Sequence, residues 1–190
     1  MWELILDNIA RAGVPLSEAE SGVLQSLFTH KKYRRNQYLL QQGEVARYET
    51  FVLKGLTRTY ELDDKGQEHV LFFGPEDWWV GDLYSFLSGA PATCNIDCLE
   101  DTEVLQISKG SLDRLYAEVP QMNLYFRLKL QNAFIALSRR ISSSLSKPAV
   151  QRYQEFLEQY PRLEQRIPNH QIASFLGITP QSLSRLRSRH

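Results

Sequence analysis

The stretch 171–186 reads Gln-Ile-Ala-Ser-Phe-Leu-Gly-Ile-Thr-Pro-Gln-Ser-Leu-Ser-Arg-Leu. Its apolar residues recur at helical spacings on both sides of a bend, and Ala173 is small enough for two helices to pack closely. Gly177 suits the left-handed residue that ends a helix, while Thr179 can cap the next helix with Pro180 at its first position. We therefore predict a helix-turn-helix. A helical hairpin buried in a larger core is the less favoured alternative.

The outer side of the second helix of this motif is polar and basic. Arg185 is placed to make a bidentate contact to guanine, and Gln181, one turn earlier, suits adenine. Arg187 and Arg189 are expected to meet phosphates. The candidate DNA-binding residues are Thr179, Gln181, Ser182, Ser184, Arg185, Arg187 and Arg189.

Charge separates the two ends of the chain. Over all 190 residues, the 22 basic and 22 acidic side chains cancel. From Arg139 onward, however, nine Lys or Arg face three Glu, which leaves thirteen basic against nineteen acidic residues before that point. The helix-turn-helix lies in the basic part, as contact with nucleic-acid phosphates requires.

Length and composition fit one large domain followed by a small one. Because 43 % of the residues are hydrophobic, the chain can bury a sizeable core. The first seven residues, Met-Trp-Glu-Leu-Ile-Leu-Asp, have no basic flank and an acid at each end of a short apolar run. This pattern is typical neither of a signal peptide nor of a membrane span, so we expect a cytoplasmic protein.

The sequence shows no set of residues typical of an enzyme or a metal site. Cys94 and Cys98 lie four residues apart in a predicted strand, on one face but too far apart for a disulfide, so we expect buried free thiols. The four histidines are scattered, which leaves a metal ion short of ligands. A nucleophile with its base, or a pair of carboxylates, is also missing from any one candidate site. We predict no catalytic residue, no metal and no cofactor, and hence no enzyme.

The middle of the chain is predicted to form strands. A capping box at Ser17-Glu18-Ala19-Glu20 starts a short helix, after which short apolar or alternating segments follow between Gly and Asp turns. The basic run 31–35 before them is typical of a solvated edge, with a nucleic-acid patch as the less favoured reading. This spacing indicates an antiparallel, jelly-roll-like β-roll. The expected strands are 38–40, 48–53, 56–62, 69–73, 78–80, 94–99 and 104–107.

A long helix is predicted after the strands. Helical periodicity resumes at Ser111, and one helix should run from Gln121 to about Leu145. It has two apolar stripes, which a single neighbour cannot bury, so we expect one stripe on the β-roll and the other on a second copy of the chain. One stripe contains Leu124, Leu128 and Ile135. The stripe expected at the dimer interface contains Phe126, Leu130, Ala133, Phe134, Leu137 and Ile141.

The segment 142–148 is expected to break this helix and act as a hinge. Pro148 cannot continue a helix, and the serines before it compete for backbone hydrogen bonds. The predicted fold class is therefore α+β: a double-stranded antiparallel β-roll, a long dimerisation helix and a small all-α helix-turn-helix domain. The expected boundaries are 1–115 for the roll, 116–147 for the long helix with its serine hinge, and 148–190 for the helix-turn-helix domain.

This order of elements resembles the Crp/Fnr family of bacterial transcription regulators. The resemblance covers almost the whole chain and rests on short signatures, each weak alone, that occur in the family's order. It implies a β-roll of the cyclic-nucleotide-binding type, a dimer through the long helix, and recognition helices in successive major grooves. The signatures are Gln42-Gly43-Glu44, Phe51-Val52-Leu53-Lys54-Gly55, Asp64-Lys65-Gly66, Gly81-Asp82-Leu83, Leu99-Glu100-Asp101-Thr102-Glu103-Val104 and 172–185.

The sequence departs from the family's pattern at three places. Family members that bind cyclic nucleotide hold the ribose with a Glu and the phosphate with an Arg, whereas the matching segments here are Gly81-Asp82-Leu83 and Pro91-Ala92-Thr93. This degenerate effector pocket therefore has Ala92 in place of the phosphate arginine. Of the positions that match the family's base-reading residues, Pro180, Gln181 and Arg185, the proline has no side-chain donor or acceptor, so the target sequence should differ. A β-hairpin wing after the second helix is missing from the sequence, which we expect to weaken the grip on DNA.

We predict from these features a homodimeric DNA-binding transcription regulator of the Crp/Fnr type that has lost effector binding through the phosphate arginine. Its expected partners are a palindromic DNA operator and a second copy of itself, without a membrane. RNA polymerase and a small-molecule effector of unknown identity stay open as further partners. The alternative is a β-roll sensor or protein-interaction module that no longer binds DNA. Recovery of an inverted repeat from a DNA pool would discriminate between them.

Overall fold

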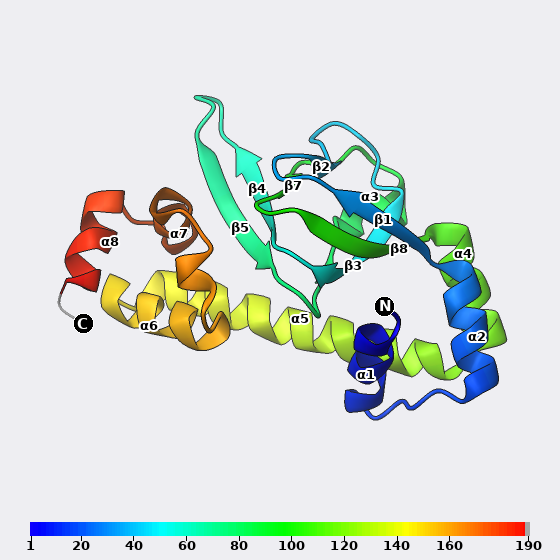
Figure 1. Ribbon diagram of the computed structural model, residues 1–190. Coiled ribbons are helices and arrows are strands. Elements are labelled where there is room, and N and C mark those ends of the chain that lie inside the picture. The colour runs from blue at the N-terminus through cyan, green and yellow to red at the C-terminus, as the bar shows by residue number, and fades with distance from the viewer. Residues whose placement is uncertain (189–190) are drawn as a thin grey trace.

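The computed structural model describes residues 1–188 and has an α+β fold (Figure 1). Two antiparallel sheets form a roll, with a long helix running beneath it and small helices grouped at either end of that helix. The predicted fold class is therefore confirmed. No helix within residues 1–188 has the length and apolar character needed to cross a membrane. The strands are β1 (Thr29–Tyr33), β2 (Tyr38–Leu40), β3 (Tyr48–Lys54), β4 (Thr57–Leu62), β5 (Glu68–Gly74), β6 (Trp79–Val80), β7 (Asn95–Cys98) and β8 (Thr102–Ser108).

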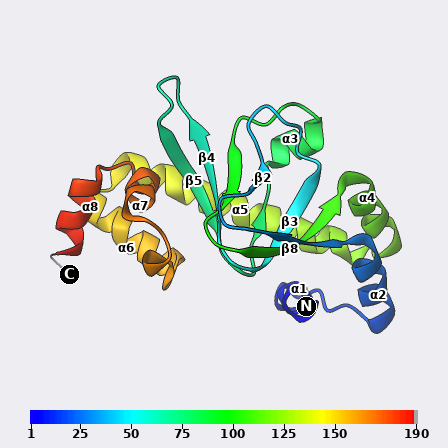
Figure 2. The same ribbon diagram turned by 45° about the horizontal axis from the view of Figure 1, so that its top comes forward.

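The helices surround this roll on two sides. Figures 1 and 2 show α1, α2 and α4 near the start of the long helix α5, and the helix-turn-helix region at the other end of α5. The helices are α1 (Glu3–Arg11), α2 (Glu18–Leu27), α3 (Leu83–Ser88), α4 (Lys109–Glu118), α5 (Gln121–Ser146), α6 (Ala149–Gln159), a 3-10 turn η1 (Leu163–Gln165), α7 (Asn169–Leu176) and α8 (Pro180–Arg187).

The strand order is β1-β8-β3-β6 in the first sheet and β2-β7-β4-β5 in the second sheet. The basic run 31–35 begins within β1, the edge strand of the first sheet, where Lys32 pairs with Glu103 at 3.0 Å. The run therefore begins in an exposed sheet edge. Sequence reasoning missed this strand because its successive basic residues hide the alternation of a half-buried strand.

The helix-facing side of the first sheet is apolar. Phe51 of β3 lies opposite Leu105 of β8, and both are fully buried. The Phe51 ring contacts Trp79, whose ring centroid lies 6.1 Å from that of Phe28 after α2 and 5.1 Å from that of Phe126 in α5. These residues belong to one core cluster with the buried side chains of α1, α2 and α4. The first sheet and its helices therefore share the larger of the two cores.

The helix-facing side of the second sheet packs on the helix-turn-helix region. Phe73 of β5 makes edge contacts with Phe156 and Tyr160 of the α6 segment, at ring-centroid distances of 6.3 and 6.0 Å. Leu56, Tyr60 and Val70 join them in a second core cluster with residues of α6, α7 and α8. The roll and the helix-turn-helix region are thus packed together rather than joined only by α5.

Local signals behave as the sequence indicates, with one exception. The capping box is formed, because Ser17 N donates to Glu20 Oε2 at 2.8 Å. The serines after Ile141 do not break α5, which continues to Ser146 and ends just before Pro148. Two of their hydroxyls donate to carbonyls three or four residues earlier: Ser144 Oγ to Ile141 O at 2.8 Å and Ser146 Oγ to Ser142 O at 2.7 Å. This bonding is compatible with a helix. The predicted helix end near Leu145 and the stop at Pro148 are therefore correct, although Ser142 to Ser146 are themselves helical.

Candidate nucleic-acid interface and effector segment

The turn of the helix-turn-helix is formed by the predicted residues. Gly177 ends α7 in the left-handed conformation with φ 64°. Thr179 caps α8 by accepting a hydrogen bond from Ser182 N at 3.2 Å, and Pro180 is the first residue of that helix. Leu183 is fully buried against α7, which fixes the side of α8 that faces solvent.

The solvent side of α8 presents the predicted polar residues. Gln181, Ser184 and Arg185 are exposed, and Ser182 is half-buried. The Arg185 guanidinium donates to Ser182 Oγ at 3.3 Å, a single contact that leaves most of its donors in water. The helix therefore offers one guanidinium, one amide and hydroxyls within two turns, which are donors and acceptors suited to base edges.

Of the two remaining arginines, Arg187 does not face solvent as expected. Arg187 is turned back into its own domain, where Nε lies 2.6 Å from Glu164 Oε1 and 3.4 Å from Tyr153 OH, and Nη1 donates to Asn169 Oδ1. Its charge is already neutralised, which argues against the expected phosphate contact. Arg189 lies outside the described residues.

The long helix exposes most of the stripe expected at the dimer interface. Leu130, Phe134, Leu137 and Ile141 are 41 to 71 % exposed, and Ala133 is exposed beside them. Phe126 is the exception, because its ring packs against Trp79, Tyr116 and Tyr125 in the first core. The assignment of Phe126 to a surface stripe was wrong, since α5 still lies against the roll at this turn.

The other apolar stripe does not pack on the roll as expected. Leu124 and Ile135 are 38 and 48 % exposed. The side of α5 that meets the rest of the chain instead carries Met122 and Tyr125 at its start and Arg140 near its end. Helical periodicity identifies apolar faces but cannot tell which face a neighbour reaches.

The degenerate effector segment lies between β6 and β7. Asp82 caps α3 by accepting from Ser85 N at 3.0 Å and also faces Cys94 Sγ at 3.7 Å. Ala92 is 3 % exposed and belongs to the first core, and its methyl side chain has no donor for a ligand. Thr93 Oγ1 donates to Glu61 Oε1 at 3.2 Å. Gly81, Leu83 and Pro91 complete the segment, and Leu83 and Pro91 are exposed.

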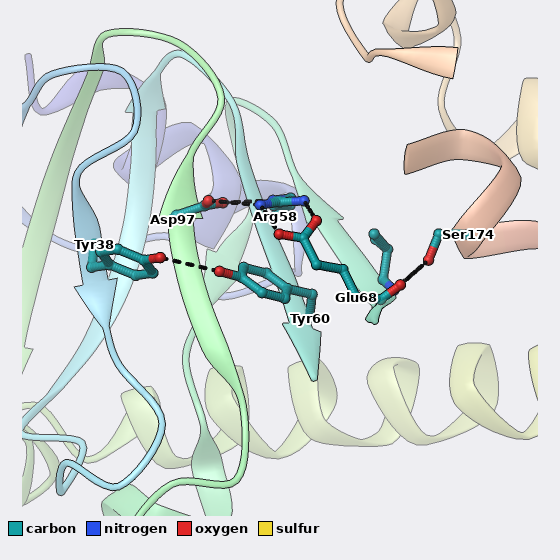
Figure 3. Close-up of polar contacts among 7 residues, drawn as sticks. Tyr38, Arg58, Tyr60, Glu68, Asp97 and Ser174 are labelled. Atoms are coloured by element: carbon teal, nitrogen blue, oxygen red, sulfur yellow. Dashed lines mark hydrogen bonds and ion pairs between the residues drawn. The ribbon is translucent and has the colours of Figure 1, made fainter. Parts of the chain in front are cut away.

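Cations close to this segment are few. Arg58 is buried and bonded to both carboxylate oxygens of Asp97 at 2.9 and 3.0 Å, and it also pairs with Glu68 (Figure 3). Lys54 is exposed at the end of β3. Arg47 alone among these three lines the cavity of about 500 Å³ beside Gly81 and Asp82.

A buried carboxylate adds to the acidic character of this region. The Glu49 oxygens lie 2.8 and 3.0 Å from where a Cβ on residue 81 would be, so a larger residue there would have to displace the Glu49 side chain. Glu49 Oε1 is sealed from solvent and has no hydrogen-bond partner among residues 1–188. Burial, together with the nearby Asp82 carboxylate, raises the pKa of Glu49 to about 8. At neutral pH an anionic ligand would therefore meet the Asp82 carboxylate beside a mainly protonated Glu49.

Three side chains that sequence reasoning missed connect the helix-turn-helix region to the roll. Ser174 of α7 bonds to the backbone of β5, Arg140 of α5 donates to carbonyls of β5 and α7, and Arg166 pairs with Glu76 and Glu100. We call these contacts, together with the second core, the joint. No local signal distinguishes these residues, because a surface serine or arginine has the same sequence environment.

Residues 30–119 match the family model described as the cyclic nucleotide-binding domain. The chain is also similar over nearly its whole length to two curated regulators. It is 24 % identical to the fumarate and nitrate reduction regulatory protein of Vibrio cholerae, covering 96 % of this chain and 78 % of that protein. It is 21 % identical to the cAMP-activated global transcriptional regulator CRP of Haemophilus influenzae, covering 95 and 87 %.

Solved structures show the same fold. A CooA mutant from Carboxydothermus hydrogenoformans superposes with a TM-score of 0.72 at 24 % identity, covering 91 % of this chain and 80 % of that one. FixK2 from Bradyrhizobium japonicum superposes with a TM-score of 0.70 at 21 % identity, covering 85 and 83 %. The order of roll, long helix and terminal helices is therefore shared with these proteins.

Proposed function

Because this chain is a member of the Crp/Fnr family of transcription regulators, we propose that it acts as a homodimer that binds a palindromic DNA operator through α8. The observation that carries the proposal is the exposed polar face of α8 behind a completely formed turn. Within the described residues, Arg185 and Gln181 are the α8 side chains best suited to guanine and adenine edges. Thr179, Ser182 and Ser184 supply shorter donors beside them.

The exposed stripe on α5 supports the dimer. Leu130, Phe134, Leu137 and Ile141 recur at three- and four-residue spacings and face away from the roll. Burial of each such side chain contributes about 1.5 to 3 kcal/mol, and a patch of this kind on a long helix is typical of a helix-helix interface. Two copies joined along α5 would present two recognition helices related by a two-fold axis, which suits an inverted repeat.

The test of DNA recognition is selection of bound sequences from a random genomic pool, followed by affinity measurements on the site recovered. We expect an inverted repeat, because its symmetry reflects that of the dimer. Arg185→Ala should cost about 1 to 3 kcal/mol and relax preference at one base pair in each half-site. Arg189→Ala should instead weaken all sequences alike and reduce the salt slope by about one. Selection of no sequence at all would favour the protein-interaction alternative.

We also propose that the roll does not hold cyclic AMP in the way that needs a phosphate arginine. Ala92 supplies no donor, Arg58 is committed to Asp97 and Glu68, and Asp82 already caps α3. A hydrogen bond from a charged donor contributes about 1.5 to 3 kcal/mol, so the missing arginine alone weakens phosphate binding at least about tenfold. Isothermal titration with cyclic AMP should show no heat up to millimolar concentration. A dissociation constant in the low micromolar range would overturn this part of the proposal.

A further inference from the structure

The helix-turn-helix domain has two opposite sides with different partners. α8 lies at the outer end of the molecule, whereas α7 lies between α8 and strand β5 (Figures 1 and 2). The exposed residues Gln181, Ser184 and Arg185 belong to the outer side. Contact with the roll therefore leaves the proposed recognition surface free.

Ser174 connects α7 to the edge of the second sheet. β5 is the last strand of that sheet, so one row of its backbone groups has no strand partner. Ser174 Oγ accepts from Val70 N at 3.0 Å and donates to Glu68 O at 2.8 Å, which satisfies two of these groups with one hydroxyl (Figure 3). The same Glu68 pairs through its side chain with the buried Arg58. α7 is thereby held at one register along β5.

Arg140 connects three elements at one point. From α5, its guanidinium donates to Leu71 O and, at 3.2 Å, to Val70 O in β5, and it donates to Phe175 O in α7 at 3.3 Å. It also lies 4.0 Å above the centre of the Phe175 ring. Among the described residues it has no carboxylate partner, so its guanidinium is stabilised by backbone carbonyls and aromatic faces. A planar, five-donor group is needed to reach these acceptors together.

Arg166 connects the helix-turn-helix domain to two loops of the roll. Its guanidinium bonds to both oxygens of Glu76 at 2.9 Å and to both oxygens of Glu100 at 2.7 and 2.9 Å. These two carboxylates come from separate loops of the roll. Ser174 and Arg140 at β5, and Arg166 at the loops of Glu76 and Glu100, thus restrain the domain beside the aromatic second core.

We propose that Arg140 is a positioning residue for operator binding: it fixes the direction of the recognition helix relative to the dimer helix through the joint. The inference rests on the proposed function. A domain linked to α5 only through Lys147 and Pro148 would sample several orientations, whereas a second attachment through β5 restricts it to one. When both recognition helices are held in one orientation, binding of the first half-site brings the second helix close to its own half-site. The second binding event then occurs at a high effective concentration.

Arg139 provides a matched control for Arg140. It is the adjacent residue of the same helix, has the same charge and is exposed without an ion pair or hydrogen bond in the structure described. Arg140→Ala should weaken binding to the complete inverted repeat about tenfold or more, while affinity for a single half-site stays within about twofold. Arg139→Ala removes an equal charge and should leave the ratio of the two affinities unchanged. Equal losses on both DNAs in Arg140→Ala would overturn the inference.

A second readout examines the joint without DNA. Cys94 and Cys98 are buried, so cysteines introduced by Lys65→Cys at the β4–β5 turn and Glu158→Cys in α6 can be spin-labelled selectively. In chains diluted with unlabelled protein, we expect one narrow distance distribution that Arg140→Ala and Ser174→Ala broaden and Arg139→Ala does not. Narrow distributions in all four proteins would overturn the inference. If the parent protein binds no DNA, the proposed function fails, and this readout alone decides whether the joint exists.

Discussion

The two sheets of the roll are covered by helices in contrasting ways. On the first sheet, Phe51 is enclosed by rings and aliphatic side chains, with Trp79 at a centroid distance of 5.5 Å. The second sheet is joined to its helices by Arg140, which donates to β5 carbonyls, and by Arg166, which pairs with Glu76 and Glu100. Within that sheet the buried Arg58 pairs with Asp97 and Glu68 of the neighbouring strands. The helices over the first sheet cover it with almost entirely apolar contacts. The cover of the second sheet combines an aromatic cluster with ion pairs and one backbone-directed arginine, Arg140.

This difference suggests that one set of contacts stabilises the roll and the other fixes the orientation of the helix-turn-helix domain. Apolar burial is non-directional and tolerates small shifts of the covering helices. Hydrogen bonds and paired charges depend on distance and angle, and a buried pair is costly when its geometry is lost. The cover of the first sheet is therefore suited to holding the roll together. The cover of the second sheet is suited to holding the helix-turn-helix domain in one direction.

The largest expected effect comes from a substitution in the apolar core between the first sheet and its helices. Phe51→Ala should lower the free energy of unfolding by about 3 to 5 kcal/mol, because the side chain is fully buried and its neighbours cannot close the cavity. Chemical denaturation followed by tryptophan fluorescence measures this loss. Tyr84→Ala is the control: it removes a ring that is 67 % exposed and should change stability by no more than about 0.5 kcal/mol. A similar loss in both variants would contradict the assignment of Phe51 to the core.

The elements of the fold could be predicted because their signals are local. The turn at Gly177 and Thr179, the capping box at Ser17 and the strands punctuated by glycine depend on residues a few positions apart. The helix α1 and strand β1 were missed, since one is short and the other carries a basic run. Ala92 was recognised as a missing donor by comparison with the family's motif, because the segment Pro91-Ala92-Thr93 matches it without the arginine.

The joint could not be predicted, because its contacts join distant parts of the chain. Ser174 and Glu68 are 106 residues apart, and nothing in the neighbouring sequence marks either as a partner of the other. Arg139 and Arg140 are adjacent and chemically identical, yet only Arg140 faces β5. Likewise, periodicity located the apolar stripes of α5 but assigned Phe126 to an exposed stripe, although its ring packs in the first core.

A smaller effect is expected from the buried ion pair between Arg58 and Asp97 within the second sheet. Asp97→Ala should lower the free energy of unfolding by about 2 to 3 kcal/mol, because Arg58 keeps Glu68 but loses a bidentate buried partner. Denaturation measures this loss against Asp113→Ala, which removes an exposed carboxylate of α4. Replacement of the pair together, Arg58→Met with Asp97→Leu, should recover much of the stability. Failure of Asp97→Ala to destabilise would remove the contrast between the two covers.

Glu49 is the polar exception in the first cover, and it should behave oppositely to Asp97. Its Oε1 is buried beside Gly81 without a partner, and its pKa is raised to about 8 from an ordinary value of 4.5. Between these two values the folded state binds more protons than the unfolded state. Stability that is fully present at low pH is therefore lost as pH rises through this window.

The smallest predicted effect is a gain in stability on replacing this carboxylate. Glu49→Gln should raise the free energy of unfolding by about 1 to 2 kcal/mol above pH 8, less than the full pKa shift implies because the side chain is only partly buried. The gain should shrink as pH falls and vanish near pH 4, where Glu49 is neutral in both states. Thermal melts from pH 4 to 9 measure it, with Glu44→Gln at the exposed cavity edge as control. A pH-independent difference would show that shape, and not charge, distinguishes the two side chains.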